Sequence, residues 1–480
     1  MSNLPAIPLN TLLNKIMEAF DLTALGRLRN DTDEISHLDE AKSIKDKIYN
    51  YGPIADYRKH TLHYVMKSLG HLPTPLLNSL IEYLDGPTSK QYLHVDAHLR
   101  LILAVNSKLK KPLQISQMAE LRKKFAVDAV AMQSPQVWRK ATSPIKHNLS
   151  PLKCASKKKP SQVNWQDETI ANADNGSMRV RCYHTGAEQV DFRNQTVRTT
   201  TDSLYNPDEI VMLFFHGGGF CIGDVDTHHE FCHSFCAQTG WPIVSVDYRL
   251  APEHPSPAAL RDCIHAYSWV VKNCHSLGAS PDRIVIAGDS AGGGLSTLIA
   301  QQVSTPTEEA WADLGADGQT TFDLLKALPS PLAQLLLYPV TDVENDYPSW
   351  ELYGEGLLLE HEDVAIFDAA CLDHSPLPRQ HVLNSPMFGN NDHVCPTYVV
   401  TAELDVLRDE AFAYAKQLHS HGVKVKTHIV LGAPHGFINL MSVHKKLGDE
   451  TKHIIEGFSN FARRLIKKEK SGLSSSANPL

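Results

Sequence analysis

The sequence predicts an α/β fold with a mostly parallel central sheet and helices on both of its faces. The first observation is that short apolar or β-branched runs alternate with helix-like stretches from about residue 163 onward. The second is a serine flanked by glycines, in GDSAG at 288–292, where such a run meets a helix-like stretch. The third is a change of pattern along the chain, because the first 140 residues show helical periodicity without strand alternation. Strands that alternate with helices are typical of a parallel sheet covered on both faces.

Seven runs are expected to form the strands of this sheet. Each is short and rich in apolar or β-branched residues, and a helical or turn-forming stretch separates it from the next. They are SMRVRCYH (177–184), EIVMLFFH (209–216), PIVSVDY (242–248), RIVIAGD (283–289), LAQLLLYP (332–339), PTYVVTA (396–402) and KVKTHIVL (424–431). Two segments interrupt the alternation. Residues 305–321 are polar and are expected to form a surface excursion, whereas residues 338–396 carry helical patches such as EDVAIFDAACL that we expect to cover the mouth of a site.

Residues 1–140 are predicted to form a mostly helical region. Helical spacing of apolar residues is clear in TPLLNSLIEYL, VDAHLRLILAVNSKL and ISQMAELRKKFAVDAVAM. Residues 141–162 are rich in Ser, Pro and Lys, which is typical of a linker. Residues 163–472 contain all the expected strands. We therefore expect a helical N-terminal region, a linker and an α/β domain.

Composition and charge exclude several classes of protein. The chain has 42% hydrophobic and 21% charged residues, as globular domains do, and no apolar run reaches the roughly 18 residues needed to span a membrane. Its 46 basic and 54 acidic residues give a net charge of −8, which disfavours a nucleic-acid partner. The first 20 residues lack the basic start and the unbroken apolar run of a secretory signal. Nine cysteines at irregular spacing favour free thiols, so we expect a cytoplasmic protein.

One segment, HHEFCHSFC, gathers residue types that bind metals. Its candidate ligands are His228, His229, Cys232, His233 and Cys236. Some of them could share a helix face and hold a metal ion. The same spacing is also typical of an amphipathic helix that buries Phe231, Cys232 and Phe235. We prefer the amphipathic helix, and we expect neither a metal nor a cofactor.

The glycine-flanked serine is the strongest chemical signal. Ser290 lies between the strand-like RIVIA and the helix-like LSTLIAQQV, which is the context of a G-x-S-x-G nucleophile elbow. In such a turn, small neighbours allow the serine to adopt a strained backbone with its hydroxyl exposed. A phosphate-binding loop would carry a lysine after the glycines, where this chain has Leu295. Ser290 is therefore the predicted nucleophile of an α/β-hydrolase fold.

A second glycine run, HGGGF at 216–220, directly follows the apolar run IVMLFF. In the elbow fold, a loop after an earlier strand supplies backbone N–H groups for the oxyanion, the negative oxygen that forms when the serine attacks a carbonyl. Glycine has no side chain to crowd this approach. The predicted donors are the N–H groups of Gly217, Gly218 or Gly219, together with that of Ala291.

A serine nucleophile needs a base, and a carboxylate must orient that base. In the elbow fold these residues follow in the order serine, acid, histidine. His435 in LGAPHGF comes after the last strand-like run, where a loop can bring its ring over the serine. After PTYVV, the segment TAELDVLRDE offers Asp405 in the turn and Glu403 close to it. The pattern favours Asp405 and leaves Glu403 as the alternative.

These motifs together resemble the hormone-sensitive lipase family of α/β-hydrolases. HGGGFCIGDVDTH, VDYRLAPEHPSPAALRD, GDSAGGG, ELDVLRDE and PHGF occur in family order and spacing across roughly residues 165–470. The resemblance implies a carboxylesterase with Ser290, Asp405 and His435 as its triad. It also implies that the N-terminal helices lie over the mouth of the site, with the first 90 residues having no counterpart in compact bacterial members.

The sequence therefore predicts a serine hydrolase that cleaves esters of short to medium acyl chains, about C2 to C8, through an acyl-enzyme. The expected partner is a small-molecule ester, with no nucleic acid and no integral membrane segment. An amidase or arylacetamide deacetylase-like hydrolase would use the same machinery and stays open. A non-catalytic receptor on the same fold is a third possibility, although receptors of this family lack the histidine that His435 supplies here.

Overall fold

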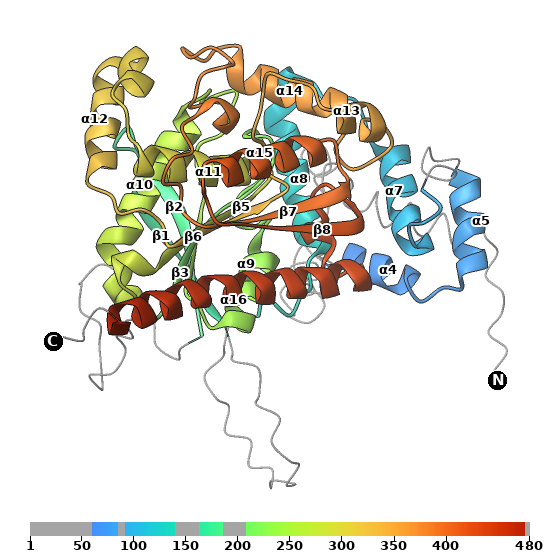
Figure 1. The fold of residues 1–480 in the computed structure, drawn as a ribbon. Helices are drawn as coiled ribbons and strands as arrows, with labels where there is room; N and C mark the ends of the chain where they lie inside the picture. The colour runs from blue at the N-terminus through green and yellow to red at the C-terminus, as the bar shows by residue number, and fades with distance from the viewer. Residues whose placement is uncertain (1–59, 85–91, 140–162, 186–207, 476–480) are drawn as a thin grey trace, which may run out of the picture.

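The computed structural model describes residues 60–84, 92–139, 163–185 and 208–475. The predicted linker, residues 141–162, lies outside the described residues. The described part of the chain contains one eight-stranded sheet in the order β1-β2-β4-β3-β5-β6-β7-β8 (Figure 1). Its strands are β1 (Asn164–Ala171), β2 (Ser177–His184), β3 (Val211–Phe215), β4 (Ile243–Val246), β5 (Ile284–Asp289), β6 (Ala333–Leu337), β7 (Thr397–Leu404) and β8 (Val425–Pro434).

The sheet is mostly parallel, as expected. Strands β3 to β8 run parallel to one another, whereas β2 is antiparallel to β4 and β1 is antiparallel to β2. The seven predicted runs correspond to β2 through β8. Strand β1 was not predicted, because its sequence NWQDETIA lacks a regular apolar alternation and buries only Ile170. It is held by pairing with β2 along its whole length, from Asn164 opposite His184 to Ala171 opposite Ser177.

Helices cover both faces of the sheet, because alternate residues of each buried strand point to opposite sides. In β3, Met212 and Phe214 belong to one apolar cluster and Leu213 and Phe215 to the other. One face is covered by α9 (His229–Thr239) and α16 (Lys445–Ser475) and the other by α10 (Ala258–Asn273), α11 (Ala291–Ser304) and α15 (Arg408–Ser420) (Figure 1). Short 3-10 turns lie at η2 (Cys274–Leu277), η3 (Pro281–Arg283), η5 (Pro386–Phe388) and η6 (Phe437–Leu440).

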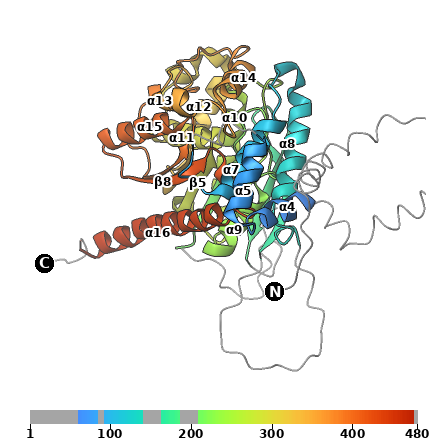
Figure 2. The same cartoon turned by 90° about the vertical axis from the view of Figure 1, so that its right-hand side faces the viewer.

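The N-terminal region is helical. Its described elements are α4 (Thr61–Leu69), α5 (Thr74–Leu84), α7 (Ala97–Leu109), η1 (Ile115–Gln117) and α8 (Met118–Met132). Helices α4, α5 and α7 lie at the β8 end of the sheet, whereas α8 contacts the loops that follow β3 and β4 (Figures 1 and 2). The Asp96 side chain caps α7 by accepting from the Leu99 N–H at 3.1 Å, and it pairs with His444 at 3.0 Å. The N-terminal helices therefore share one apolar cluster with α16 and the end of β8.

Residues 305–321, predicted as a surface excursion, are mostly exposed, and the structure adds that most of them are helical. This part of the chain forms η4 (Glu309–Leu314) and most of α12 (Gly315–Lys326). Trp311 is fully buried, and its indole N–H donates to Gln302 of α11 at 2.9 Å. A Cβ on Gly318 would lie 1.9 Å from the Trp311 carbonyl oxygen, so the close packing at this position requires glycine.

The segment between β6 and β7 carries α13 (Pro348–Tyr353) and α14 (His361–Leu372). Helix α14 coincides with the predicted helical patch EDVAIFDAACL. It lies at the edge of the sheet where β3 and β5 end, and its Phe367 ring packs on the loop that follows β3.

Helix α9 is the amphipathic helix expected from HHEFCHSFC. Phe231, Cys232 and Phe235 are buried in the core, so the preferred interpretation of this segment is confirmed. Within the described residues, no group of three His, Cys, Asp or Glu side chains is placed to hold a metal ion. The described helices also include none that is both long and apolar enough to cross a membrane.

His229, the first residue of α9, joins the end of the N-terminal region to the sheet. Its Nε2–H donates to the carbonyl of Val137 at 2.9 Å, and its Nδ1 accepts from the hydroxyl of Tyr183 on β2 at 3.0 Å. The ring stacks on Trp138 with 4.1 Å between centroids. Burial lowers the pKa of His229 to about 3, and the neighbouring guanidinium of Arg181 acts in the same direction. The ring is therefore neutral in the folded protein at neutral pH.

This neutral ring makes folding dependent on pH. Because the folded pKa lies below the unfolded value near 6.5, the unfolded chain binds the extra proton below pH 6.5 and stability falls as the pH drops. Each pH unit contributes about 1.4 kcal/mol, so lowering the pH from 7.5 to 5 costs the wild-type protein about 2 kcal/mol through this residue. His229→Phe lacks this titration. The free energy of unfolding, measured with urea, should differ between wild type and His229→Phe by about 2 kcal/mol less at pH 5 than at pH 7.5.

Tyr183→Phe is the matched control, since it removes a hydrogen bond to the same ring without removing the titrating group. Its stability difference from wild type should stay nearly constant between the two pH values. A difference between wild type and His229→Phe that is equally large at both pH values contradicts the neutral assignment.

Candidate active site

The sharp turn between β5 and α11 presents Ser290. Its backbone has φ 53° and ψ −122°, a conformation that non-glycine residues rarely adopt. The turn is fixed on both sides of the serine: the Ser290 N–H donates to the carbonyl of Leu337 at 2.9 Å, and the Ser290 carbonyl accepts from Val340 at 3.1 Å. Glycines make this possible, because a Cβ on Gly292 would lie 2.0 Å from the carbonyl oxygen of Phe215. The turn thus has the geometry of a nucleophile elbow.

The structure brings His435 and Asp405 to this serine. His435 follows β8, and its Nε2 lies 2.9 Å from the Oγ of Ser290. Its Nδ1 lies 2.8 Å from Oδ2 of Asp405, which follows β7 and is 1% exposed. The other carboxylate oxygen of Asp405 accepts from the Leu407 N–H at 2.9 Å. With Nδ1–H donating to the carboxylate, Nε2 is left to accept the serine proton.

Glu403, the alternative acid, faces another part of the molecule. Its Oε2 accepts from the backbone N–H of Gly432 at 2.5 Å, and its Oε1 lies 3.6 Å from Nε2 of His94. The structure therefore pairs Asp405, and not Glu403, with His435. Both residues lie at the end of β7, so their places in the sequence do not separate them and only tertiary contacts do.

The loop after β3, residues 216–220, runs beside Ser290 and needs glycine at three positions. Gly218 and Gly219 have φ of 123° and 56°, which side chains disfavour. A Cβ on Gly218 would lie 2.2 Å from the carbonyl oxygen of Ile222, and one on Gly219 would lie 2.4 Å from the ring of Phe367. The N–H groups of Gly218, Gly219 and Ala291 make no hydrogen bond to another described residue.

The prediction for Gly217 needs correction. Its backbone N–H donates to Oδ1 of Asp289 at 2.8 Å, so it is already engaged and does not point toward a reacting carbonyl. A Cβ at this position would lie 2.6 Å from the Asp289 carboxylate. Gly217 is therefore an anchoring residue of the loop, and the free N–H groups belong to the two glycines that follow it and to Ala291.

The loop is covered by two segments that are far apart in sequence. Phe367 of α14 and Met118 at the start of α8 pack with Ile222 in one apolar cluster. Arg122 of α8 donates to the carbonyls of Cys221 at 2.8 Å and Ala251 at 2.9 Å. In addition, Lys110 forms ion pairs with Glu360, at 2.9 Å, and Asp363 at the N-terminus of α14.

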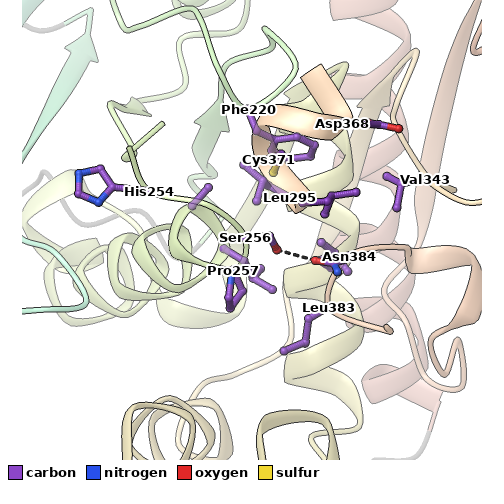
Figure 3. A pocket seen from close by; sticks show the side chains of 14 residues that line it. Phe220, His254, Ser256, Pro257, Leu295, Val343, Asp368, Cys371, Leu383 and Asn384 are labelled. Carbon is purple, nitrogen blue, oxygen red and sulfur yellow. Dashed lines mark hydrogen bonds between the residues drawn. The ribbon is translucent and has the colours of Figure 1, made fainter. Parts of the chain in front are cut away.

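A mostly apolar pocket lies next to the glycine loop, and Phe220 forms part of its wall (Figure 3). Phe220 comes from the glycine loop, Leu295 and Leu298 from α11, and Leu372 from α14. Its polar groups include Asp368 and the hydrogen-bonded pair of Ser256 and Asn384, at 2.5 Å. The pocket thus lies between the glycine loop and α11, the helix that begins directly after Ser290.

Sequence reasoning missed three contributors to the site: Asp289, Arg122 and Phe367. Asp289 could have been identified, because it occupies the first variable position of the G-x-S-x-G motif and is a charged residue at the end of a buried strand. Arg122 and Phe367 carry no local signal, since their partners lie about 100 to 150 residues away.

Known proteins share these features. Residues 212–439 match the model of an α/β-hydrolase-fold family. The chain is 52% identical over 420 residues to Lipase 2 of Moraxella sp. (strain TA144), an alignment that covers 86% of this chain and 92% of that protein. It is 47% identical over 90 residues to hormone-sensitive lipase of Ictidomys tridecemlineatus, covering 19% of this chain and 12% of that protein.

Among solved structures, a hyperthermophilic esterase from the archaeon Pyrobaculum calidifontis matches with a TM-score of 0.57 and 26% identity. The match covers 76% of this chain and 98% of the esterase. The chain therefore belongs to the α/β-hydrolase family and to its hormone-sensitive-lipase-like branch.

Proposed function

We propose that this ester hydrolase works through an acyl-enzyme intermediate on Ser290, with His435 as the base and Asp405 as the acid that orients it. The observation that carries the proposal is the continuous chain of contacts from Ser290 Oγ to His435 Nε2, at 2.9 Å, and from His435 Nδ1 to Asp405, at 2.8 Å. The presence of His435 in this chain argues against a non-catalytic receptor on the same fold.

The reaction follows from this geometry. His435 takes the Oγ proton as Ser290 attacks the ester carbonyl carbon, and the carbonyl oxygen becomes negatively charged. The free N–H groups of Gly218, Gly219 and Ala291 stabilise that oxygen. When the intermediate collapses, the C–O bond to the alcohol breaks and His435 gives its proton to the leaving alcohol. A water molecule then attacks the acyl-enzyme by the same route and releases the carboxylic acid. Asp405 stays ionised throughout and stabilises the imidazolium.

We infer that the acyl chain is short to medium and extends past Phe220 into the apolar pocket. Phe220 directly follows Gly219, and Leu295 and Leu298 lie on the helix that begins after Ser290, so the pocket adjoins the two segments that would hold the carbonyl. The contacts of α8 and α14 with the glycine loop support a cap built from the N-terminal region (1–140) and α14 over the 163–472 catalytic domain. Such a cap excludes water and limits chain length.

We also infer a cytoplasmic location. The eight described cysteines are all buried and unpaired, which supports a reducing compartment. Cleavage of anilides by the same residues remains an alternative, and a p-nitroanilide beside the ester substrates tests it.

Ser290→Ala should abolish hydrolysis of p-nitrophenyl butyrate, with turnover reduced by about 10⁵-fold or more, because the nucleophile is lost. Labelling by a fluorophosphonate should disappear as well, while thermal unfolding stays like that of wild type. Covalent labelling that persists in this variant shows that another residue is the nucleophile.

Asp405→Asn should lower turnover by about 10³- to 10⁴-fold, because a neutral amide cannot stabilise the imidazolium of His435. Glu403→Gln is the matched control. It removes one carboxylate at the end of the same strand and should keep turnover within about threefold, since Glu403 contacts Gly432 and His94 instead. The reverse order of effects in steady-state kinetics identifies Glu403 as the acid.

The pocket and the cap are tested by the rates of p-nitrophenyl esters from C2 to C12. Leu298→Trp fills the pocket and should lower the ratio of the C8 to the C4 rate by about tenfold or more. Arg122→Ala releases α8 from two carbonyls near the glycine loop and should broaden the profile toward longer chains.

Matched controls accompany both variants in this series. Leu298→Met conserves volume and should keep the wild-type profile. Lys123→Ala removes an exposed neighbour of Arg122 and should do the same. A wild-type profile in Leu298→Trp rejects the pocket as the acyl site, and one in Arg122→Ala rejects the cap.

A further inference from the structure

Asp289 is a buried carboxylate that the reaction described above does not use. It is 2% exposed and directly precedes Ser290. Its Oδ1 accepts from the Gly217 N–H at 2.8 Å, and its Oδ2 accepts from the hydroxyl of Tyr338 at 3.4 Å. The ring of Tyr338 in turn lies edge-on to the ring of His435, with 4.8 Å between centroids. One side chain therefore contacts the glycine loop and a neighbour of the histidine.

A second buried residue faces the same carboxylate. His228 is 2% exposed, and its Nε2 lies 3.1 Å from Asp289 Oδ1, at ion-pair distance. Its Nδ1 lies 2.9 Å from the hydroxyl of Thr227, which donates its own proton to the carbonyl of Asp224 at 2.7 Å. The hydroxyl must therefore accept from Nδ1–H. The other ring nitrogen lies at ion-pair distance from a carboxylate, an arrangement that favours a ring protonated on both nitrogens.

The electrostatics agree with this assignment. Burial lowers the pKa of His228, but the Asp289 carboxylate outweighs burial and holds that pKa above its ordinary value. Burial likewise raises the pKa of Asp289, yet His228 and the Gly217 N–H bring it below its ordinary value. The next histidine, His216, is different: burial and the charge of His228 lower its pKa to about 4, so it is neutral. The neutral ring contacts the carbonyl of Gly217 through Nδ1, at 2.9 Å.

We propose that Asp289 and His228 are positioning residues that hold the glycine loop in its stabilising conformation. A run of three glycines has many accessible backbone conformations, so the direction of the Gly218 and Gly219 N–H groups must be set from outside the run. Asp289 sets it by fixing the amide of Gly217, the first residue of the run. His228 keeps Asp289 ionised and in place, because a buried carboxylate without a partner would be strongly unfavourable.

This inference rests on the proposed function, since it assigns the loop to stabilising charge in the transition state. Replacing Asp289 or His228 is therefore expected to lower kcat with little change in KM, because the loop N–H groups bind the oxyanion more strongly than the ground-state carbonyl. Affinity for a trifluoromethyl ketone, which forms a charged tetrahedral adduct with the serine, should fall by the same factor as kcat/KM.

The first test compares two replacements of His228. His228→Gln keeps a polar donor toward Asp289, whereas His228→Phe keeps an aromatic ring of similar size next to Phe214 and His216. If His228 positions Asp289, the Phe variant should lose about tenfold to hundredfold in kcat and the Gln variant should retain most of the activity. If the ring serves packing alone, the order is reversed, and that result overturns the proposal.

The second test uses Asp289 in the same way. Asp289→Asn keeps an oxygen that can accept from Gly217, so it should be more active than Asp289→Ala, which has no acceptor. Rates are expressed per active site titrated with a fluorophosphonate, so that partial unfolding does not count as a catalytic loss. Equal kcat and equal ketone affinity in wild type, Asp289→Ala and His228→Phe would falsify the inference.

His233 supplies the control for the histidine series. It is a partly buried histidine on the same helix, α9, and it makes no contact with Asp289 among the described residues. His233→Gln and His233→Phe should keep the wild-type kcat. The two failures are distinguishable. If the proposed function is wrong, Ser290→Ala retains hydrolysis and labelling, whereas failure of this inference leaves Ser290→Ala inactive.

Discussion

The strained backbone at Ser290 is the constraint on which the rest of the site depends. A residue with φ 53° and ψ −122° is stable only where its surroundings hold it, and here Ser290 donates to the Leu337 carbonyl and accepts from the Val340 N–H. The same turn requires close approach, because a Cβ on Gly288 would lie 2.2 Å from the carbonyl oxygen of Gly292. The end of β3 also meets this turn, because a Cβ on Gly292 would lie 2.0 Å from the carbonyl oxygen of Phe215. The loop that follows β3 therefore begins beside the serine.

Parallel topology brings the remaining groups to this edge. β7 and β8 end next to each other, so Asp405 and His435 meet although 30 residues separate them in sequence. This explains why so much of the site could be predicted from sequence. Local patterns at strand ends mark the serine, the histidine and the glycine run, and the parallel order of the strands brings them to one edge of the sheet. The pattern favoured Asp405 but left Glu403 open, because both residues lie at the end of the same strand and only the three-dimensional contacts separate them.

The features that sequence reasoning missed depend on contacts distant in the chain. Strand β1 is held by its pairing with β2 and has no apolar alternation of its own. Residues 305–321 are predicted to lie on the surface, but their helices are not predicted, and Trp311 of η4 packs on α11 through its hydrogen bond to Gln302. The Gly217 N–H looked available because the glycine run alone does not reveal the carboxylate of Asp289 that occupies it. In each case the deciding partner lies outside the local pattern.

The cap over the site has a consequence for how the chain is made. Lys110 and its partner Asp363 are 253 residues apart, and Arg122 and its partner Cys221 are 99 residues apart. At a synthesis rate of about 5 to 20 residues per second, the ribosome needs about 10 to 50 s to supply α14 after α8 has emerged. During that interval the apolar side chains of α8, including Met118, have no partner from α14. These side chains are therefore open to aggregation until α14 is made, and the cap can be completed only after that point of synthesis.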